Sequence, residues 1–459
     1  MRSDTFSLFM LHGLQAVAAN GSQASNFEIS SEMAQKYGCG DICQQTLRET
    51  NPADIKTFGT NFDFNFYATA ANFSCSKPGD VLKIKPINSS EISFPAGVAT
   101  YKIQYTSVDI DDSIVPSTGF IAFPFARTKT TFNLVAYAHG TSGVFRGCAP
   151  STSPNLYDYQ SWTTLLLAGY AVIATDYAGL GNNYTAHKYI ASAANANDTY
   201  WSVVAARQAF PDVLSHEWAS IGHSQGGGAV WKLSEHGLVQ DSASGYLGGV
   251  SVAPVSKLYD ALLGINQLRD FAAYLPSDLD NHAFLALGVL PSAALGIKAT
   301  FPDYSAPILS DKMKQRIELA QIGQLCDNAI SGLAWDLRLD AFSNVTIQSD
   351  KRLQDFQKLN APAQGDRASK PLLLILGAED TIVSQESGEA SYADSCRFGN
   401  PVHMSIYPGL DHSAVLTASA PEWLAFLQGR FRNSPFGNCS QETKAPFDLE
   451  HASRPEDTH

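Results

Sequence analysis

The fold is decided by Ile221-Gly222-His223-Ser224-Gln225-Gly226-Gly227-Gly228, a turn that places one serine in a Gly-x-Ser-x-Gly frame. Residues 217–221 before it read as a short strand, and residues 229–236 after it read as a helix. This context is typical of a nucleophile elbow, in which a strained backbone lifts the serine hydroxyl to the top of a sheet. The turn needs small neighbours, which Gly222 and Gly226 provide. A glycine-rich turn without chemistry is the alternative, because the chain contains 34 glycines.

Two later loops supply partners for the serine. Residues 371–376 form a continuous apolar run typical of a buried parallel strand, and Asp380 follows it. Residues 402–407 read as a second strand, and His412 follows that one. Serine, acid and base occur in this order in α/β-hydrolases. The sequence therefore predicts Ser224 as nucleophile, His412 as general base and Asp380 as the carboxylate that orients the histidine and stabilises its imidazolium.

Neighbouring residues compete for the acid and base roles. His403 lies inside the predicted strand, where an imidazole is usually a packed side chain, so His412 is favoured. Glu379 and Asp411 could also orient the histidine. Asp380 is favoured over both by its distance past the strand.

A catalytic serine also needs hydrogen-bond donors for the tetrahedral oxyanion. The backbone N–H of Gln225, the residue after the nucleophile, is one expected donor. The second is expected from His139-Gly140-Thr141-Ser142-Gly143, which follows the predicted strand 132–138. Thr141 is favoured for this role, with Ser142 and a simple turn as alternatives.

With these residues the chain resembles the fungal secretory lipase (LIP-type) group of α/β-hydrolases from about residue 60 to residue 435. The resemblance implies an α/β-hydrolase core with a mostly parallel sheet, a helical cap inserted late in the fold, and hydrolysis of carboxylic esters. Members most like true lipases tend to have tyrosine where His223 stands and a different oxyanion loop, so esterase activity is favoured over the hydrolysis of long-chain fats. The motifs that carry the resemblance are His139-Gly140-Thr141-x-Gly143, Cys148-Ala149-Pro150-Ser151, residues 169–181, the Gly-His-Ser-Gln-Gly-Gly elbow and the Asp380/His412 pair.

The seven cysteines favour disulfides, because they include no Cys-x-x-Cys pair for zinc or redox chemistry. Buried thiols in a cytosolic enzyme are the alternative. The resemblance implies two bridges, Cys148 with Cys326 and Cys396 with Cys439. The three remaining cysteines, Cys39, Cys43 and Cys75, leave one unpaired. That thiol is either free or bonded to another molecule, unless the implied pairing is incomplete.

Two features predict a secreted protein. Residues 1–20 carry a positive start at Arg2, apolar stretches and small residues at a possible cleavage site, so we expect a signal peptide, with a disordered or amphipathic segment as the alternative. Asparagine sequons are glycosylated only on the secretory route. Seven are present, at Asn20, Asn72, Asn88, Asn183, Asn197, Asn344 and Asn438.

The charge and composition of the chain limit the classes of partner that it can bind. A net charge of −13 and a pI near 5.2 argue against nucleic acid, which requires a basic surface. The sequence contains no stretch of eighteen apolar residues, so no membrane span is predicted. The histidines lack metal-ligand spacing, so we expect neither metal nor cofactor. The expected partner is a small-molecule or lipid ester, and the expected state is a monomer.

The length of 459 residues fits one α/β-hydrolase core with an insertion. Little strand signal appears in residues 258–359, where apolar residues recur at helical spacing. Residues 284–297 there are apolar on all faces and could roof a pocket or pack on the core. Asp176 follows a strand and reads as structural. The predicted organisation is a signal peptide (1–20), an N-terminal arm (21–60), core (61–257), helical cap (258–359), core (360–440) and disordered tail (441–459).

Two other functional classes are compatible with the motifs. The same triad could carry out acyl transfer or peptide-bond cleavage. A catalytically silent binding protein on a hydrolase scaffold is the other alternative. The complete set of Ser224, Asp380 and His412 favours a serine ester hydrolase over both.

Overall fold

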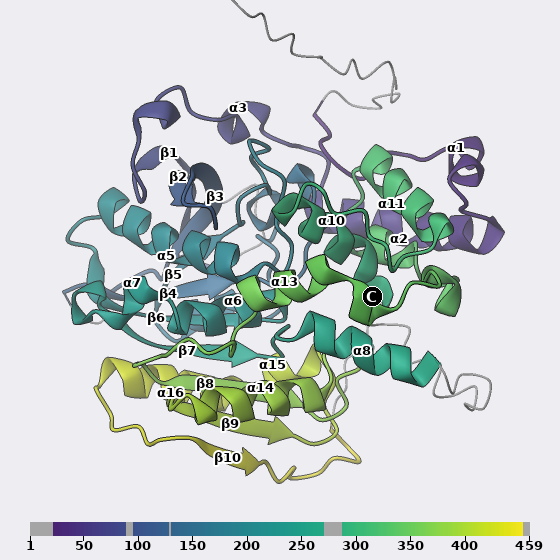
Figure 1. Ribbon diagram of the computed structural model, residues 1–459. Coiled ribbons are helices and arrows are strands. Elements are labelled where there is room, and N and C mark those ends of the chain that lie inside the picture. Colours follow the sequence, from purple (N-terminus) through teal and green to yellow (C-terminus); the bar gives the residue numbers. More distant parts are fainter. Residues whose placement is uncertain (1–21, 89–94, 128–129, 270–286, 453–459) are drawn as a thin grey trace, which may run out of the picture.

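The computed structural model describes residues 22–88, 95–127, 130–269 and 287–452. Ten strands of this part form one sheet in the order β1-β2-β3-β5-β4-β6-β7-β8-β9-β10 (Figure 1). Pairing is antiparallel from β1 to β5 and parallel from β5 onward, which confirms the predicted α/β class. The strands are β1 Val81–Pro86, β2 Ala99–Val108, β3 Ile114–Phe123, β4 Phe132–Ala138, β5 Ala171–Thr175, β6 Leu214–His223, β7 Tyr246–Val252, β8 Leu372–Gly377, β9 Val402–Tyr407 and β10 Ser440–Thr443.

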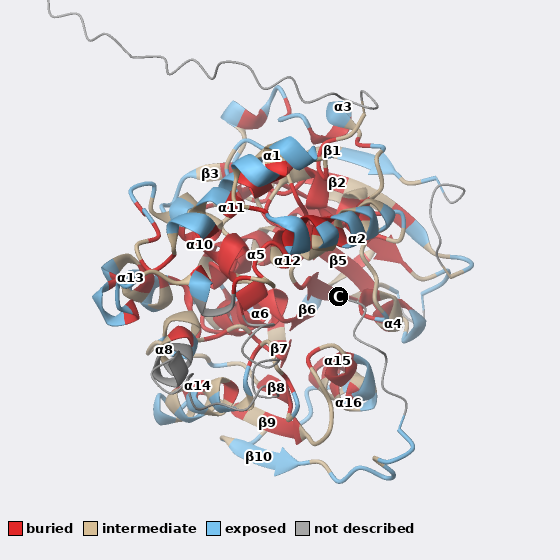
Figure 2. Ribbon diagram, turned by 90° about the vertical axis from the view of Figure 1, so that its right-hand side faces the viewer, coloured by how far each residue is buried: buried red, intermediate tan, exposed pale blue. Residues whose placement is uncertain are grey.

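Helices cover both faces of the sheet. One face packs against α4, α15 and α16, and the other packs against α5, α6 and α14. Figure 2 shows the buried residues along the strands and along α5 and α6, with exposed residues on outer helices such as α1 and α2. These helices are α1 Ser31–Lys36, α2 Asp41–Phe58, α3 Phe64–Tyr67, α4 Trp162–Leu167, α5 Ser192–Ala209, α6 Gln225–Ser234, α7 Gly237–Gln240, α14 Gln385–Arg397, α15 Ala414–Ala418 and α16 Ala420–Phe431.

Successive side chains of a central strand enter opposite layers. On β4, Val135 and Tyr137 pack toward α4, whereas Leu134 and Ala136 pack toward α5. Because both faces are covered, the strand must be apolar throughout, which is why runs such as residues 371–376 are recognisable in the sequence. In the described part of the chain, no helix has the length and apolar character needed to cross a bilayer.

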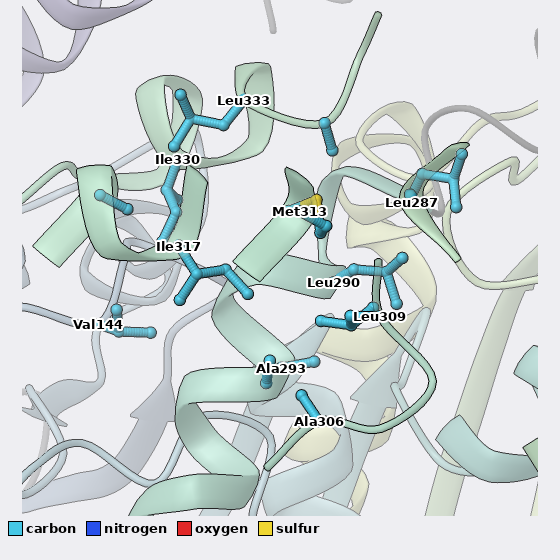
Figure 3. Close-up of a cluster of buried hydrophobic side chains, with 14 of the residues drawn as sticks. Val144, Leu287, Leu290, Ala293, Ala306, Leu309, Met313, Ile317, Ile330 and Leu333 are labelled. Atoms are coloured by element: carbon cyan, nitrogen blue, oxygen red, sulfur yellow. The ribbon is translucent and has the colours of Figure 1, made fainter. Parts of the chain in front are cut away.

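The regular elements of residues 258–359 are helical in the described part. They are α8 Leu258–Arg269, α10 Leu290–Thr300, α11 Asp311–Gly323, α12 Asp327–Gly332 and α13 Lys351–Asn360, with short 3₁₀ turns at Arg338–Ala341 and Ile347–Ser349. Side chains of α10, α11 and α12 meet in one apolar cluster, which also contains Val144 from the loop after β4 (Figure 3). Residues 284–286 of the predicted apolar run lie outside the described residues. From Leu290 onward the run is α10, which packs in this cluster.

The N-terminal arm holds α12 in place. Asp54 of α2 is fully buried and accepts hydrogen bonds from the backbone N–H groups of Asn328 and Ala329 at 3.2 and 2.9 Å. These N–H groups belong to the first turn of α12, where the helix itself offers no acceptor. The arm therefore caps a helix whose first turn is 274 and 275 residues away in sequence from Asp54.

The C-terminal segment differs from the prediction. We expected residues 441–459 to be disordered, but Ser440–Thr443 form β10 and pair in parallel with His403–Ile406 of β9. The Cys396–Cys439 disulfide ends one residue before this strand and fixes its start. The prediction is therefore wrong for the first residues of this segment.

Three disulfides are present. The two pairs implied by the family resemblance, Cys148–Cys326 and Cys396–Cys439, are both formed. The third joins Cys39 and Cys43 across the turn between α1 and α2. Cys75 is the remaining cysteine, and it is free and exposed.

Removing the Cys148–Cys326 bridge is expected to lower the melting temperature by about 5 °C or more. The two cysteines are 178 residues apart, and loss of a native disulfide typically costs about 2–5 kcal/mol of stability. The measurement is differential scanning calorimetry of the Cys148→Ser/Cys326→Ser double variant. Cys75→Ser is the matched control and should melt as the wild type does. Equal melting temperatures for all three proteins would contradict a stabilising role of the bridge.

Stability is also expected to fall as the pH rises from 5 to 8. Burial raises the pKa of Asp54 to about 6, of Asp198 to about 7 and of Glu235 to about 8. Between pH 4 and these values each carboxyl is still protonated in the native state but ionised in the unfolded chain, so over that range each removes up to roughly 1.4 kcal/mol of stability per pH unit. Chemical denaturation at several pH values measures the slope. Glu235→Gln should flatten it between pH 6 and 8, and an unaltered slope in that variant would contradict the assignment.

Candidate active site

Ser224 lies in a tight turn between β6 and α6, with φ +56° and ψ −118°. A residue with a side chain rarely adopts this conformation, so the turn must be held by its surroundings. The Ser224 N–H donates to the Val252 carbonyl at 2.9 Å, and the Ser224 carbonyl accepts from Val255 N–H at 3.2 Å. Only 6% of the serine surface is exposed. The structure thus has the elbow geometry predicted from the Gly-x-Ser-x-Gly frame.

The two glycines of this frame leave no room for a side chain. A Cβ on Gly222 would lie 2.1 Å from the Gly226 carbonyl oxygen, and a Cβ on Gly226 would lie 1.9 Å from the Ala138 carbonyl oxygen. The helix can therefore begin directly at Gln225, against the ends of β4 and β6, only because these positions lack side chains. The helix begins earlier than predicted from residues 229–236.

Asp380 and His412 lie at the same edge of the sheet as Ser224. β6, β7, β8 and β9 are adjacent and parallel, so their carboxyl ends meet at this edge. His412 Nδ1 lies 2.7 Å from Asp380 Oδ2, and the two side chains are 9% and 2% exposed. The other oxygen, Oδ1, accepts from the N–H groups of Ile382 and Val383 at 2.9 and 2.8 Å. The carboxylate is thus fixed from both sides and can hold a proton on Nδ1 of the histidine.

The competing residues have other contacts. His403 lies within β9, with Nδ1 2.8 Å from the Ser440 hydroxyl on β10. Asp411 accepts from the N–H groups of Ser413 and Ala414 in the turn before α15. Glu379 is exposed. The carboxylate in contact with His412 is that of Asp380.

The loop after β4 lies against the elbow. Ala138 at the end of β4 is paired in register with Gly222, so residues 139–143 begin beside the nucleophile turn. The Thr141 hydroxyl lies 2.8 Å from the Tyr189 hydroxyl, and the Thr141 carbonyl accepts from Tyr157. These contacts hold the loop in which we predict an oxyanion donor.

Gln225 is the first residue of α6, and its N–H has no acceptor within the helix. Its side chain is buried. The Nε2 atom lies 3.1 Å from His187 Nε2 and 3.2 Å from the side-chain oxygen Oδ1 of Asn195. The side chain is thereby held among α5 and the segment before it. The backbone N–H at this position remains the predicted oxyanion donor.

Asp176 has the structural role expected of it. The side chain is fully buried and accepts hydrogen bonds from Ser151 N–H at 2.8 Å and from the hydroxyls of Ser151 and Thr118. These bonds tie the end of β5 to β3 and to the Cys148–Ser151 segment. Burial raises the pKa of this carboxyl, and the hydrogen bonds oppose that effect.

Several residues near the elbow were missed in the sequence. His223 was noted in the elbow motif only as a departure from the lipase pattern, and the tyrosines that contact the loop after β4 come from segments that no motif links to it. One available signal was the density of tyrosines between residues 157 and 189. Their positions in the sequence follow no period, so the cluster could not be assembled without the fold. The residues are Tyr157, Tyr159, Tyr189 and His223.

The asparagines of the predicted glycosylation sites differ in their exposure to solvent. Asn197 is buried within α5, so the structure argues against a glycan there. Asn20 lies outside the described residues. The other five asparagines are exposed: Asn72, Asn88, Asn183, Asn344 and Asn438.

Comparison with known proteins gives matches over most of the chain. No established family profile matches it. Lipase 10 of Candida albicans is 24% identical over 411 residues, which cover 83% of each chain. The secreted triacylglycerol lipase LIP7 of Malassezia globosa is 22% identical over 405 residues, which cover 83% of this chain and 81% of that one. The closed state of Candida antarctica lipase A is 18% identical with a TM-score of 0.64, covering 82% of this chain and 88% of that one.

These matches extend across both parts of the predicted core and the residues between them. They confirm the family resemblance seen in the motifs, and the solved structure confirms the fold. The chain is therefore a relative of the fungal lipases and a carboxylic ester hydrolase built on the α/β-hydrolase fold.

Proposed function

We propose that the chain hydrolyses esters of small carboxylic acids through an acyl-enzyme on Ser224, with His412 as base and Asp380 as the orienting acid. The observation that carries this proposal is the 2.7 Å contact between His412 Nδ1 and Asp380 Oδ2 at the sheet edge where the strained Ser224 lies. A serine hydroxyl is a weak nucleophile at neutral pH and needs a base held in the correct tautomer. The Asp380 carboxylate accepts the hydrogen on Nδ1 of His412 and so holds the imidazole in that tautomer.

The reaction proceeds in two halves. Ser224 Oγ attacks the ester carbonyl carbon while its proton passes to His412 Nε2, and the carbonyl oxygen becomes the oxyanion. The N–H groups of Gln225 and Thr141 donate to that oxygen. The imidazolium then returns the proton to the leaving alcohol as the carbon–oxygen bond breaks. Water then attacks the acyl-enzyme through the same steps, which releases the acid and restores Ser224.

The surroundings of the loop after β4 favour small or polar acyl groups. Tyr157 and Tyr189 contact Thr141 through their hydroxyls, so the side chains around this loop are aromatic and polar. In this proposal residues 258–359 act as the cap over the core formed by residues 61–257 and 360–440. The packing of Val144 within the cap cluster supports that role.

The first test is a series of p-nitrophenyl esters from acetate to palmitate, with triglyceride emulsions alongside. We expect kcat/KM to peak at short acyl chains. A maximum at palmitate or at the emulsion would contradict the proposed substrate class. The nucleophile is tested separately by labelling with a p-nitrophenyl phosphonate and mapping the modified peptide. We expect one label per chain on Ser224, and turnover that survives complete labelling of Ser224 would overturn the mechanism.

We also propose that the enzyme is secreted. Disulfides persist in oxidising compartments, and five exposed sequons and the secreted relative LIP7 support the same location. Expression in a secreting yeast should give glycopeptides at exposed sites and an unmodified Asn197 peptide. Retention of the protein inside the cells would contradict the proposal.

A further inference from the structure

We propose that His223, the residue before the nucleophile, is a positioning residue that holds the His412 loop through the His412 main-chain carbonyl, with Tyr159 fixing the tautomer of its ring. The inference rests on the proposed role of His412 as base. It adds a residue that neither the triad nor the oxyanion loop contains.

His223 contacts the base loop directly. Its Nε2 lies 2.8 Å from the His412 carbonyl oxygen, and the centroids of the two rings are 4.8 Å apart. A carbonyl oxygen can only accept, so Nε2 of His223 carries a proton and donates it. Only 5% of His223 is exposed, so water competes little for this bond. The elbow therefore anchors the backbone of the residue that must accept its proton.

Tyr159 determines the state of the other ring nitrogen. Its hydroxyl oxygen accepts from Gly140 N–H at 3.2 Å and from the Tyr137 hydroxyl at 2.9 Å. The Tyr159 hydrogen is then directed to His223 Nδ1, which lies 3.4 Å away. Burial raises the pKa of Tyr159 to about 12, so the hydroxyl keeps this hydrogen at neutral pH. Nδ1 accepts and Nε2 donates, which is the neutral form of His223.

This hydrogen-bonded path joins three loops. It runs from Gly140 after β4 through Tyr159 to His223 at the end of β6, and on to His412 after β9. Gly140 precedes the predicted oxyanion donor Thr141. Donor, nucleophile and base are thus held relative to one another by side chains that do not react. A displacement of about 1 Å in such a site can cost roughly a hundredfold in rate.

The neutral state of His223 also matters for charge. His412 becomes an imidazolium in the transition state, and a second positive charge on a ring 4.8 Å away would oppose it. Donation from Tyr159 to Nδ1 disfavours protonation of that nitrogen. The titratable groups that face this path from the surrounding elements are Tyr137 on β4, Asp158 and Tyr159 in the segment after β4, Asp327 on α12, and His412 with Asp380 behind it.

The test compares His223→Leu with His223→Gln, using single-turnover acylation and steady-state kinetics on a short p-nitrophenyl ester. Leucine should lower kcat by roughly 10- to 100-fold with KM within about twofold of wild type. Glutamine can donate to the His412 carbonyl and accept from Tyr159, so it should restore kcat to within about threefold. His403→Leu, the same change at a histidine on β9, is the matched control and should leave kcat unaltered. A fully active His223→Leu, or equal losses in both His223 variants, would overturn the inference.

Tyr159→Phe is the second variant, and it keeps the ring while removing the hydroxyl. His223 can then protonate, so we expect the acid limb of the kcat/KM profile to steepen from one proton to two, with kcat roughly 3- to 10-fold lower. An unaltered kcat with an unaltered limb would overturn the role of Tyr159. His412→Ala separates the inference from the proposed function. If that variant is inactive while His223→Leu is fully active, only the positioning role fails, whereas an active His412→Ala would refute the triad itself.

Discussion

Replacing Ser224 with alanine is expected to lower kcat for a short p-nitrophenyl ester by roughly 10⁵-fold or more. The hydroxyl is the atom that forms the acyl-enzyme, and no neighbouring group can replace it on the strained turn. The residual rate should equal that of an enzyme that only binds and polarises the ester. Initial-rate measurements with purified variant, over hours and at high enzyme concentration, are needed to detect it.

Ser215→Ala is the matched control for this experiment. Ser215 is near the other end of β6, where its hydroxyl donates to the Glu217 carbonyl. The control should retain wild-type kcat, and both variants should melt near the wild-type temperature. Comparable turnover by Ser224→Ala and wild type would mean that another residue is the nucleophile.

Asp380→Asn should lower kcat by roughly 10³- to 10⁴-fold while leaving the fold intact. The two N–H donors of Ile382 and Val383 require an oxygen at Oδ1, so the new amide must place its NH₂ where Oδ2 stood. That NH₂ lies against His412 Nδ1 and can only donate. The ring must then carry its proton on Nε2, where it cannot accept the proton of Ser224.

Two controls isolate this tautomer effect. Asp411→Asn and Glu379→Gln change the neighbouring carboxyls by the same chemistry, and we expect kcat within a few-fold of wild type for both. Asp411 caps a turn and Glu379 is exposed. If Asp411→Asn were the more damaging substitution, the orienting acid would have been assigned to the wrong loop.

Local patterns in the sequence were enough to predict the sheet and the strand ends that carry the candidate triad. A strand covered on both faces must be apolar throughout, and residues 371–376 show this clearly, whereas residues 402–407 are recognisable by their alternating character. The start of α5 was harder to predict, because its first turns bury polar side chains such as Asn195 and Asp198 and so lack an apolar stripe. The early start of α6 depends on the close approach of Gly226 to Ala138, which propensity does not indicate.

The contacts around the elbow could not be predicted in the same way. His223 and His412 are 189 residues apart, and His223 and Tyr159 are 64 apart. Each pair meets only because β4, β6 and β9 end at one edge of the sheet. Burial is equally invisible in a short motif: the Asn197 sequon is complete in the sequence, yet its side chain lies inside the protein.

All seven cysteines lie within the described residues, and six of them are bridged, which leaves Cys75 as a single addressable thiol. A maleimide support or dye would therefore attach at one point and hold every molecule in the same orientation. Asn72 lies three residues before this thiol and is exposed, so a glycan there would shield it. The production host would thus decide the use: unglycosylated protein from the oxidising bacterial periplasm would suit oriented immobilisation, while yeast protein with a glycan on Asn72 would resist thiol modification.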